Sequence, residues 1–378
     1  MNAHERLEAS VKLQQLPAGE VPVAPLIITY TARLAGMKQV DIFNSVKAWR
    51  QAVDRAIDRI GPPDMGFAIF PRDVPFSEGL HYRLPGRDLG EDELFQLIEE
   101  EVMQREDYER LQKDGFGRWF MDYFVRLDPD LPAGGRSRTI VTLKFIRMAL
   151  RIRGNAARLE KRGVPPAFYG ACYPPFDFFS LARSINQFSL DLYDCPDLVQ
   201  KACEASLEPT LGTAMQPLMA TGGKRVCIYP MRSSTSFINP KMFEKFALDH
   251  LKRMAEFFVK KGITPIIHCD ANWTPLLPFF REMPRASCIL ELDNDTDIFK
   301  AKEILGDWMC LKGNVPAQLL AFGETGEVEA YCEKLIREVG RGGGFILGSG
   351  CEVPLNARIE NVQAMIQVAR GWGSARTN

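Results

Sequence analysis

The residues that could do chemistry stand at the ends of short apolar runs in the second half of the chain. His268 and Asp270 stand at the end of the run Thr264–Cys269, and Cys351 follows the run Gly344–Leu347. An imidazole nitrogen, a carboxylate oxygen and a thiolate sulfur are all good zinc ligands, and three protein ligands with an open fourth position are typical of a catalytic site. His268, Asp270 and Cys351 are therefore candidate ligands of a catalytic zinc ion.

The spacing at the end of the run Thr264–Cys269 indicates which of its side chains share one site. Side chains alternate in direction along a strand, so His268 and Asp270 point to one side and Cys269 to the other. Asp270 is therefore the favoured middle ligand, and Cys269 replaces it if the strand end twists. The same spacing is compatible with a buried core histidine and a buried thiol that never meet.

Further polar side chains follow the later apolar runs. Glu291 is a candidate fourth metal ligand if its strand points it inward, and a paired charge at the rim otherwise. Asp293 is predicted to be a catalytic carboxylate. Asn314, together with Tyr30 near the first run, is predicted to bind the cofactor.

Aromatic side chains and one arginine near the ends of the runs are candidates for substrate binding. These predicted substrate-binding residues are Tyr173, Phe176, Arg232, Phe237 and Trp273. As a group, the aromatic residues would line an apolar pocket, whereas each aromatic side chain taken singly is more often part of a core.

Eight apolar runs, separated mostly by amphipathic helical stretches, would position these residues. The runs are Val23–Thr29, Gly66–Phe70, Phe168–Cys172, Arg225–Tyr229, Thr264–Cys269, Cys288–Leu292, Trp308–Lys312 and Gly344–Leu347. Short continuous apolar runs are typical of strands buried on both faces of a parallel sheet. Eight such strands alternating with helices predict an α/β fold, a (β/α)8 TIM barrel whose site lies at the C-terminal ends of the strands. An open doubly wound sheet is the alternative.

Helix boundaries are marked at several places. A helix after the first run is expected to stop at Gly61-Pro62-Pro63, where glycine and proline cannot continue it. A second helix is expected to begin with Asn239 as its N-cap and to end at Gly262.

Residues from about 86 to 165 are too many for one crossover between strands. An acidic stretch over 91–111 and a basic stretch over 136–163 are both predicted to be helical. The prediction is a single barrel domain over 1–378, with an N-terminal extension and a helical insertion that caps or flanks the barrel mouth. The basic face is either solvated or a docking surface for an acidic partner. Its residues are Arg136, Arg138, Lys144, Arg147, Arg151 and Arg153.

Composition excludes several classes of function. The chain has 378 residues and a formal net charge of −1, which gives no reason to expect nucleic acid or an anionic membrane as a partner. Its nine cysteines are scattered without a C-x-x-C pair, as expected in a reducing compartment. The N-terminus has no apolar signal region and no apolar run is long enough to span a membrane. We therefore expect a soluble, cytoplasmic protein.

Several segments resemble the uroporphyrinogen decarboxylase superfamily, and the resemblance extends from Val21 over nearly the whole chain. The segments are YDCPDLVQ, PIIHCDAN, LELDND, LKGNVPAQLL, FGETGEVEAYCEKLI and ILGSGCEVPLNARIENVQAMIQVAR. The last is the most specific, because its glycine-flanked cysteine, proline, asparagine and Glu-Asn pair resemble the methyltransferase branch. That branch includes methylcobalamin:coenzyme M methyltransferases and corrinoid-dependent O-demethylases, whose members typically hold zinc with His-x-Cys and a distant Cys.

The resemblance implies roles for individual residues. His268 matches the histidine of the family and Cys351 its distant cysteine, whereas Asp270 occupies the place of the middle cysteine and Cys269 stands one residue early. A carboxylate ligand makes the metal a harder Lewis acid, which suits oxygen more than sulfur substrates.

The implied function is zinc-dependent transfer of a methyl group between a small methylated substrate, best an aryl methyl ether, and a corrinoid. The Asp-x-His-x-x-Gly motif that ligates cobalt is missing, so methylcobalamin or a related corrinoid is expected on a partner protein. A metal-free decarboxylase acting through Asp293 and arginines is one alternative, although the arginine-bearing N-terminal signature of the decarboxylase is absent. A catalytically silent binding protein is the other.

Overall fold

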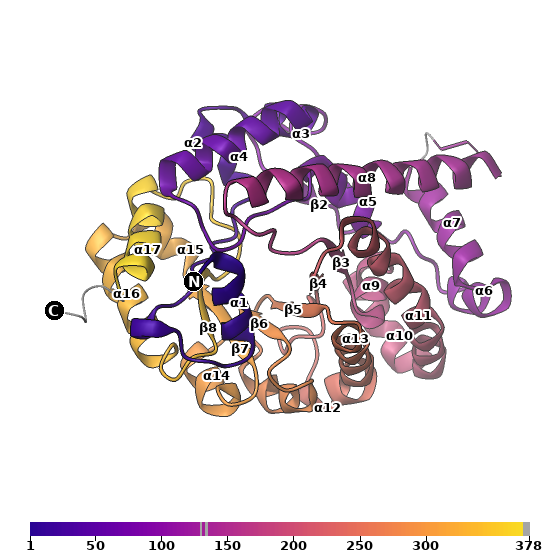
Figure 1. Ribbon diagram of the computed structural model, residues 1–378. Coiled ribbons are helices and arrows are strands. Elements are labelled where there is room, and N and C mark those ends of the chain that lie inside the picture. The colour runs from indigo at the N-terminus through magenta and orange to yellow at the C-terminus, as the bar shows by residue number, and fades with distance from the viewer. Residues whose placement is uncertain (129–130, 133–134, 373–378) are drawn as a thin grey trace.

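A parallel sheet of six strands forms the centre of the computed structural model, which describes residues 1–128, 131–132 and 135–372. The strands follow one another in the order β3-β4-β5-β6-β7-β8 (Figure 1). Their bounds are Gly170–Cys172 (β3), Arg225–Ile228 (β4), Thr264–Cys269 (β5), Ile289–Leu292 (β6), Cys310–Val315 (β7) and Phe345–Ser349 (β8). Every residue of β4, β6, β7 and β8 is buried, as the continuous apolar runs predict.

Two extended segments of the N-terminal part continue the ring from β8 back toward β3. Val23 forms a parallel bridge with Leu347 of β8, and Gly66 forms one with Pro166 just ahead of β3. The two segments are joined to each other where the Asp64 amide donates to the Val23 carbonyl at 2.7 Å. Backbone hydrogen bonds thus pass around the barrel interior, and the arrangement is that of a TIM-barrel type of α/β fold.

The sequence predicted regular strands at Val23–Thr29 and Gly66–Phe70. This prediction was wrong, because both segments form only isolated bridges. Proline has no amide hydrogen, so it cannot donate to a strand ladder. The prolines in and beside the two segments are Pro22, Pro25, Pro62, Pro63 and Pro71.

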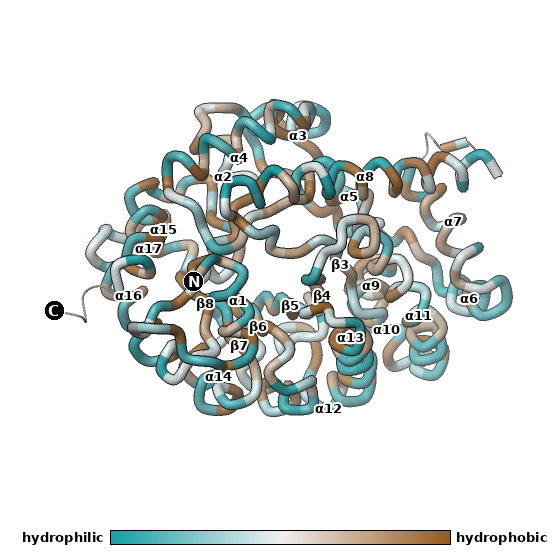
Figure 2. Tube along the Cα trace, viewed as in Figure 1, coloured by the Kyte–Doolittle hydropathy of each residue, from teal (hydrophilic) through white to brown (hydrophobic). Residues whose placement is uncertain are grey.

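Helices surround the strands, and the hydrophilic residues gather on their outer turns, as on α12 (Figure 2). In the N-terminal part they are α1 (Ala3–Val11), η1 (Pro17–Gly19), α2 (Tyr30–Ala35), α3 (Gln39–Asn44), α4 (Val46–Ile60) and η2 (Pro71–Asp73). Between β3 and β5 they are α9 (Pro175–Ala182), α10 (Ile185–Asp194), α11 (Pro196–Thr221), α12 (Pro240–Phe243), η3 (Glu244–Leu248) and α13 (Asp249–Lys260). The last are η4 (Thr274–Glu282), α14 (Ile298–Leu305), α15 (Ala317–Phe322), α16 (Thr325–Glu338) and α17 (Ile359–Gly371).

The expected helix boundaries agree with the structure. Helix α4 ends at Ile60, and Gly61 has a φ of 87° that favours glycine. Asn239 caps α12 by accepting a hydrogen bond from the Met242 amide at 3.0 Å. No helix within the described ranges is both long and apolar enough to cross a lipid bilayer.

The long segment between the second extended segment and β3 is only partly helical. It holds α5 (Val74–Glu78), β1 (Tyr82–Arg83), β2 (Gln96–Leu97), α6 (Asp107–Asp114), α7 (Phe116–Leu127) and α8 (Gly135–Lys161). The basic helix is present as α8, but the acidic stretch 91–111 becomes helical only from Asp107 onward. Tertiary pairing overrides the helical propensity of the acidic residues, because β2 pairs with β1 and the amides of Val102 and Met103 donate to the Ala182 carbonyl.

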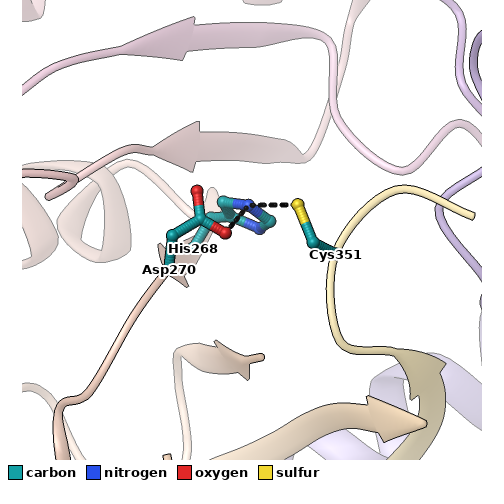
Figure 3. A group of neighbouring side chains, drawn as sticks. All are labelled: His268, Asp270 and Cys351. Carbon is teal, nitrogen blue, oxygen red and sulfur yellow. Dashed lines mark hydrogen bonds and ion pairs between the residues drawn. The ribbon is translucent and has the colours of Figure 1, made fainter. Parts of the chain in front are cut away.

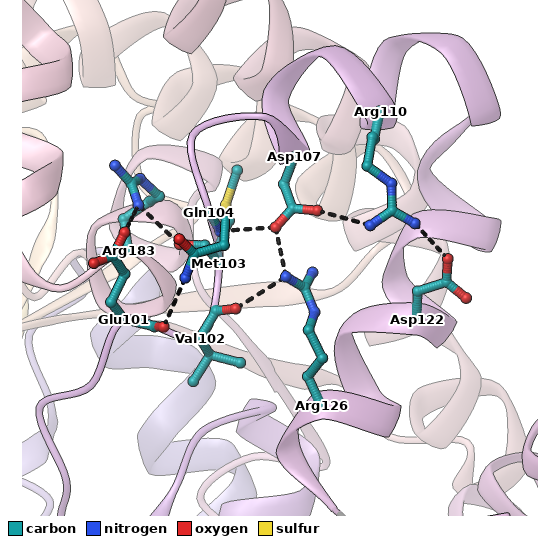
Figure 4. A network of polar contacts seen from close by, with 9 residues as sticks. All are labelled: Glu101, Val102, Met103, Gln104, Asp107, Arg110, Asp122, Arg126 and Arg183. Carbon is teal, nitrogen blue, oxygen red and sulfur yellow. Dashed lines mark hydrogen bonds and ion pairs between the residues drawn. The ribbon is translucent and has the colours of Figure 1, made fainter. Parts of the chain in front are cut away.

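Buried charges tie this insertion together and to α9 (Figure 4). The buried Asp107 carboxylate accepts hydrogen bonds from Arg126 at 2.6 Å and from the Gln104 amide at 2.8 Å. Arg183, directly after α9, donates to the Met103 carbonyl at 2.9 Å and also pairs with Glu101. The insertion is therefore anchored by polar contacts rather than by a continuous strand ladder.

Candidate metal centre

Three potential metal ligands converge at the C-terminal ends of β5 and β8 (Figure 3). The His268 Nε2 atom lies 3.2 Å from Asp270 Oδ1 and 4.0 Å from Cys351 Sγ. One ligand atom from each of the three residues lies within 4.8 Å of the other two. The structure thus brings together the three residues that the sequence singled out for zinc.

The donor set fits a zinc ion. Zinc binds nitrogen and oxygen ligands at about 2.0–2.2 Å and thiolate at about 2.3 Å in a tetrahedron, which spaces the donor atoms by about 3.3–3.8 Å. The measured separations of 3.2 and 4.0 Å need only small side-chain movements to match that spacing. Three protein donors leave the fourth position open for a substrate.

Strand β5 directs its side chains as the alternation predicts. His268 lines the cavity described below, whereas Cys269 is buried in the hydrophobic cluster between the strands and the outer helices. Cys269 is therefore separated from the group of three donors. Asp270, which occupies the middle position of the sequence pattern, is the residue that the fold brings to His268.

The loop after β5 holds Asp270 in place. Ala271 has a φ of 67°, a conformation that costs energy for a residue with a side chain, and its amide donates to the Asp293 carboxylate at 2.6 Å. The Trp273 indole donates to the Asp270 carbonyl at 2.8 Å, and the Thr296 hydroxyl to the Ala271 carbonyl at 2.8 Å. Asp293 and Trp273 thus support the loop, which differs from the catalytic and substrate-binding roles expected for them.

Behind the imidazole, a row of charged side chains crosses three neighbouring strands. His268 pairs in register with Glu291 of β6, and Glu291 with Lys312 of β7. The Glu291 carboxylate lies 3.4 Å from His268 Nδ1 and is in contact with the Lys312 ammonium. All three side chains are buried. Glu291 therefore faces the side of the ring away from the donor group and orients the imidazole, as a paired charge rather than a fourth ligand.

Electrostatic interactions offset the cost of burying these charges. Burial raises the pKa of Glu291, but Lys312 and His268 outweigh burial and lower it to about 2. Burial lowers the pKa of His268, but the Asp270 and Glu291 carboxylates raise it well above its usual value. Metal binding requires a neutral imidazole and a thiolate, so loading the site would release protons.

Cys351 follows β8 in a loop that is bonded to the first extended segment. The Ser349 hydroxyl donates to the Cys351 carbonyl at 2.6 Å and accepts from the Leu26 amide at 2.9 Å. The Glu352 carboxylate accepts a hydrogen bond from the Thr29 amide at 2.5 Å. The thiol is thus carried by a short, well-bonded turn at the barrel mouth.

A cavity of about 280 Å³ opens from the three donors toward the insertion. His268, Asp270 and Cys351 line one part of it, and Tyr173 lines it too, so its role in substrate binding stays a prediction. The aromatic residues of its wall are Phe67, Tyr82, Phe95, Phe116, Phe120, Tyr173, Phe178 and Tyr229. A flat apolar substrate could therefore reach the candidate metal centre while remaining enclosed by rings.

The other predicted contact residues lie away from this cavity. Tyr30 is fully buried and donates to the Ala357 carbonyl, and Phe176 is buried beside Phe188. Arg232 donates to the Ser180 carbonyl and pairs with Glu99.

Phe237 and Asn314 also lie elsewhere. Phe237 is 48% exposed, and Asn314 is buried and accepts a hydrogen bond from the Tyr331 hydroxyl at 3.0 Å. Core packing or local pairing thus takes up Asn314, Tyr30, Phe176 and Arg232, and Phe237 faces solvent, because proximity to a strand end does not fix side-chain direction.

Sequence reasoning missed residues that the structure places at the site. Tyr229, whose ring packs edge-on to His268 at 5.5 Å, ends a run that had been recognised. Lys312 shares the inward row of His268 and Glu291, and strand alternation applied to three strands at once could have found it. Glu78 lies on a short helix of the insertion region, where no periodic pattern marks its direction.

Comparison with models of protein families identifies the family of this chain. The model of the uroporphyrinogen decarboxylase (URO-D) family matches residues 149–372, which is more than half of the chain. The chain therefore belongs to the uroporphyrinogen decarboxylase family.

Individual relatives are more distant. A uroporphyrinogen decarboxylase of Coxiella burnetii is 26% identical over 140 residues, which are 36% of this chain and 37% of that enzyme. The Methylcobamide:CoM methyltransferase MtbA of Methanosarcina mazei is 24% identical over 216 residues, which are 56% of this chain and 60% of that enzyme. A solved methyltransferase from Methanosarcina mazei has the same fold, with a TM-score of 0.72, 17% identity and 98% of each chain covered.

Proposed function

We propose that this chain is a zinc-dependent methyltransferase that moves a methyl group between a small methylated substrate and a corrinoid protein, with an aryl methyl ether as the preferred substrate. The observation that supports the proposal most strongly is the group of nitrogen, oxygen and sulfur donors within 4.8 Å of one another, set in an aromatic cavity. Similarity to the Methylcobamide:CoM methyltransferase MtbA supports methyl transfer with a cobamide.

Each residue of the centre has a defined task in this proposal. His268, Asp270 and Cys351 would hold zinc, which when bound supplies Lewis acidity at the heteroatom that carries the methyl group. Glu291 fixes the imidazole, and Lys312 neutralises the buried carboxylate. Asp270 stands where relatives in the methyltransferase branch typically carry a thiolate, and this harder ligand favours an oxygen substrate over a sulfur substrate.

The aromatic wall would bind the aryl methyl ether, and the open barrel mouth would admit the corrinoid. Aromatic side chains enclose the ring of an aryl ether by offset or edge contacts. A corrinoid in its Co(I) state would supply the electron pair that accepts the methyl carbon in the same step in which the bond to the ether oxygen breaks. The oxygen would keep the electron pair of the broken bond. Since the chain lacks a cobalt-ligating motif, the corrinoid would arrive on a partner.

A decarboxylase activity is the second candidate, because the Coxiella burnetii relative carries that name. Gripping a tetrapyrrole with many carboxylates requires converging arginines or lysines. Within the described part of the chain, the residues that line the cavity include neither. Asp293, the carboxylate expected to act in that chemistry, is engaged by the backbone amides of Ala271 and Asp295. The cavity therefore favours methyl transfer.

The decisive experiment combines elemental analysis with single-turnover kinetics. The purified protein is expected to contain about one zinc ion per chain and to lose it on dialysis against a chelator. With an aryl methyl ether and a corrinoid protein reduced to Co(I), the zinc-loaded protein should produce methylcobalt, which is followed by its absorbance. The protein alone should show no turnover. Demethylation without any corrinoid, or full activity of the zinc-free protein, would contradict the proposal.

A further inference from the structure

A second group of polar side chains lines the same cavity. Its residues are far from the three donors in the sequence. Glu78 is the last residue of α5, Tyr82 lies in β1, and Tyr173 directly follows β3. The Tyr82 hydroxyl donates a hydrogen bond to the Glu78 carboxyl group, and the Tyr173 hydroxyl also interacts with it. We call these three residues the Glu78 group.

The Glu78 group is built from uncharged partners. Burial raises the pKa of Glu78 to about 7, although the hydroxyls of Tyr82 and Tyr173 act to lower it. No lysine or arginine lines the cavity within the described ranges. A carboxylate or a sulfonate placed beside Glu78 would therefore lose its hydration without gaining a lysine or arginine partner there.

A cationic ligand is disfavoured for a different reason, because burial favours the uncharged form of the Glu78 carboxyl group. An ammonium ion bound beside Glu78 would hold the carboxyl group in its ionised form, whereas the partners present are hydroxyls. A neutral hydroxyl group on the ligand matches them, because it offers one donor to the remaining acceptor positions of the carboxyl group. The Glu78 group thus favours a hydroxyl.

Tyr173 connects the Glu78 group to the candidate metal centre. Burial raises the pKa of Tyr173 well above its usual value, and the carboxyl groups of both Glu78 and Asp270 add to that increase. The rings of Phe95, Phe116 and Phe120 belong to the same cavity wall. The Glu78 group and the three donors therefore line one cavity, and an aromatic ligand bound against its wall would face both.

We propose that the Glu78 group selects an uncharged methoxyphenol as the substrate, by hydrogen bonding between Glu78 and the phenolic hydroxyl while the methoxy oxygen faces His268, Asp270 and Cys351. This inference rests on the proposed function and narrows its substrate class. An ether without the hydroxyl leaves the Glu78 carboxyl group with an unfilled position beside an aromatic wall, and a carboxylated methoxyphenol places a second acid beside it.

Equilibrium binding tests the selection without methyl transfer, so that failure of the inference and failure of the proposed function are distinguishable. The zinc-loaded protein is titrated calorimetrically with 2-methoxyphenol, with methoxybenzene, with 4-hydroxy-3-methoxybenzoate and with phenyltrimethylammonium. The Kd for 2-methoxyphenol is expected to be about tenfold lower than that for methoxybenzene, the worth of one buried hydrogen bond. The benzoate and the ammonium ligand should bind more weakly than 2-methoxyphenol.

Three variants test whether Glu78 causes the difference in Kd between the two ligands. Glu78→Leu should bring the Kd ratio of methoxybenzene to 2-methoxyphenol to about one, whereas Glu78→Gln keeps a polar group of the same shape and should retain most of it. Glu93→Gln, at an exposed acidic residue of the insertion, is the matched control and should leave the ratio unchanged. The inference is overturned if 2-methoxyphenol does not bind, if the wild-type ratio is one, if Glu78→Leu retains it, or if the benzoate or the ammonium ligand binds more tightly.

Discussion

Strands β5–β8 and the insertion over residues 86–165 contribute to the same cavity by different means. The strands carry their functional side chains in register, so that His268, Glu291 and Lys312 form one buried row across three neighbours. The insertion contributes Phe95, Phe116 and Phe120 to the wall from a two-residue strand region and a short helix.

The two regions also differ in what fixes them. Ladder hydrogen bonds on both sides hold β5, β6 and β7, and buried charges reinforce the strand ends. The insertion depends on side-chain contacts around Asp107 and Arg183. We infer that the rigid strands set metal binding and that the insertion sets which substrate and partner approach. Substitutions in the strands should therefore change metal content, whereas substitutions in the insertion should change substrate affinity.

The largest effect is expected from Cys351→Ser in the strand region. A hydroxyl is a poor zinc ligand, so the variant should lose its zinc and its methyl transfer while the barrel stays folded. Elemental analysis, activity and the thermal unfolding midpoint measure the three properties, and the midpoint should stay within about 5 °C. Cys195→Ser, which lies outside the donor group, is the control and should keep both metal and turnover. A Cys351→Ser protein with full zinc would disprove the assignment.

A smaller effect should distinguish the two neighbours at the end of β5. Asp270→Ala removes one of three donors and is expected to weaken zinc binding by about 100-fold or more. Cys269→Ala should leave zinc affinity unchanged and lower the free energy of unfolding by about 1 kcal/mol, because its thiol is buried in the outer cluster. Competition with a chromogenic chelator gives both affinities. The opposite ranking would assign the middle ligand to Cys269.

The same contrast explains what the sequence could predict. Runs buried on both faces carry a strong apolar signal, so β5 was predicted without error and β6 to within one residue. Alternation along β5 also separated His268 and Asp270 from Cys269. The insertion lacks that signal. Its stretch 91–106 forms β2 and loops through pairing with β1 and Ala182, contacts that no local pattern encodes. The direction of Glu291 depends on Lys312, a pairing that becomes visible only when neighbouring strands are aligned.

Glu291→Gln probes the support of the metal ligand rather than the ligand itself. Loss of the carboxylate behind His268 should weaken zinc binding by about 10- to 100-fold. It also leaves Lys312 buried without a counter-charge, so the free energy of unfolding should fall by about 3 kcal/mol. The double variant Glu291→Gln/Lys312→Met separates these effects, since it should recover stability but not zinc affinity. Equal recovery of both would show that Glu291 acts only through folding.

In the insertion, Asp107→Asn should change substrate binding without changing the metal. The substitution weakens the charge-assisted contact with Arg126, worth about 1.5–3 kcal/mol, and the longer, more exposed contact with Arg110, which contributes little. Because the insertion carries part of the cavity wall, the Kd for an aryl ether should rise by up to about tenfold. Zinc content should stay at the wild-type level. A loss of zinc in this variant would contradict the separation of the two regions.

The smallest effect is expected on the outer face of α8, where the basic residues divide into two sets. Lys144 is paired with Asp128 and Arg151 with Asp73. The exposed set is Arg136, Arg138, Arg147 and Arg153. If α8 meets an acidic corrinoid protein, replacing the exposed set with glutamine should lower the rate of encounter by a few-fold at low salt and have little effect at high salt. Stopped-flow formation of methylcobalt over a range of salt concentrations measures this difference.

The matched double variant Lys144→Gln/Arg151→Gln removes charges that are already neutralised locally, so its salt dependence should resemble that of the wild type. Equal salt dependence in both variants would place the docking surface elsewhere on the barrel.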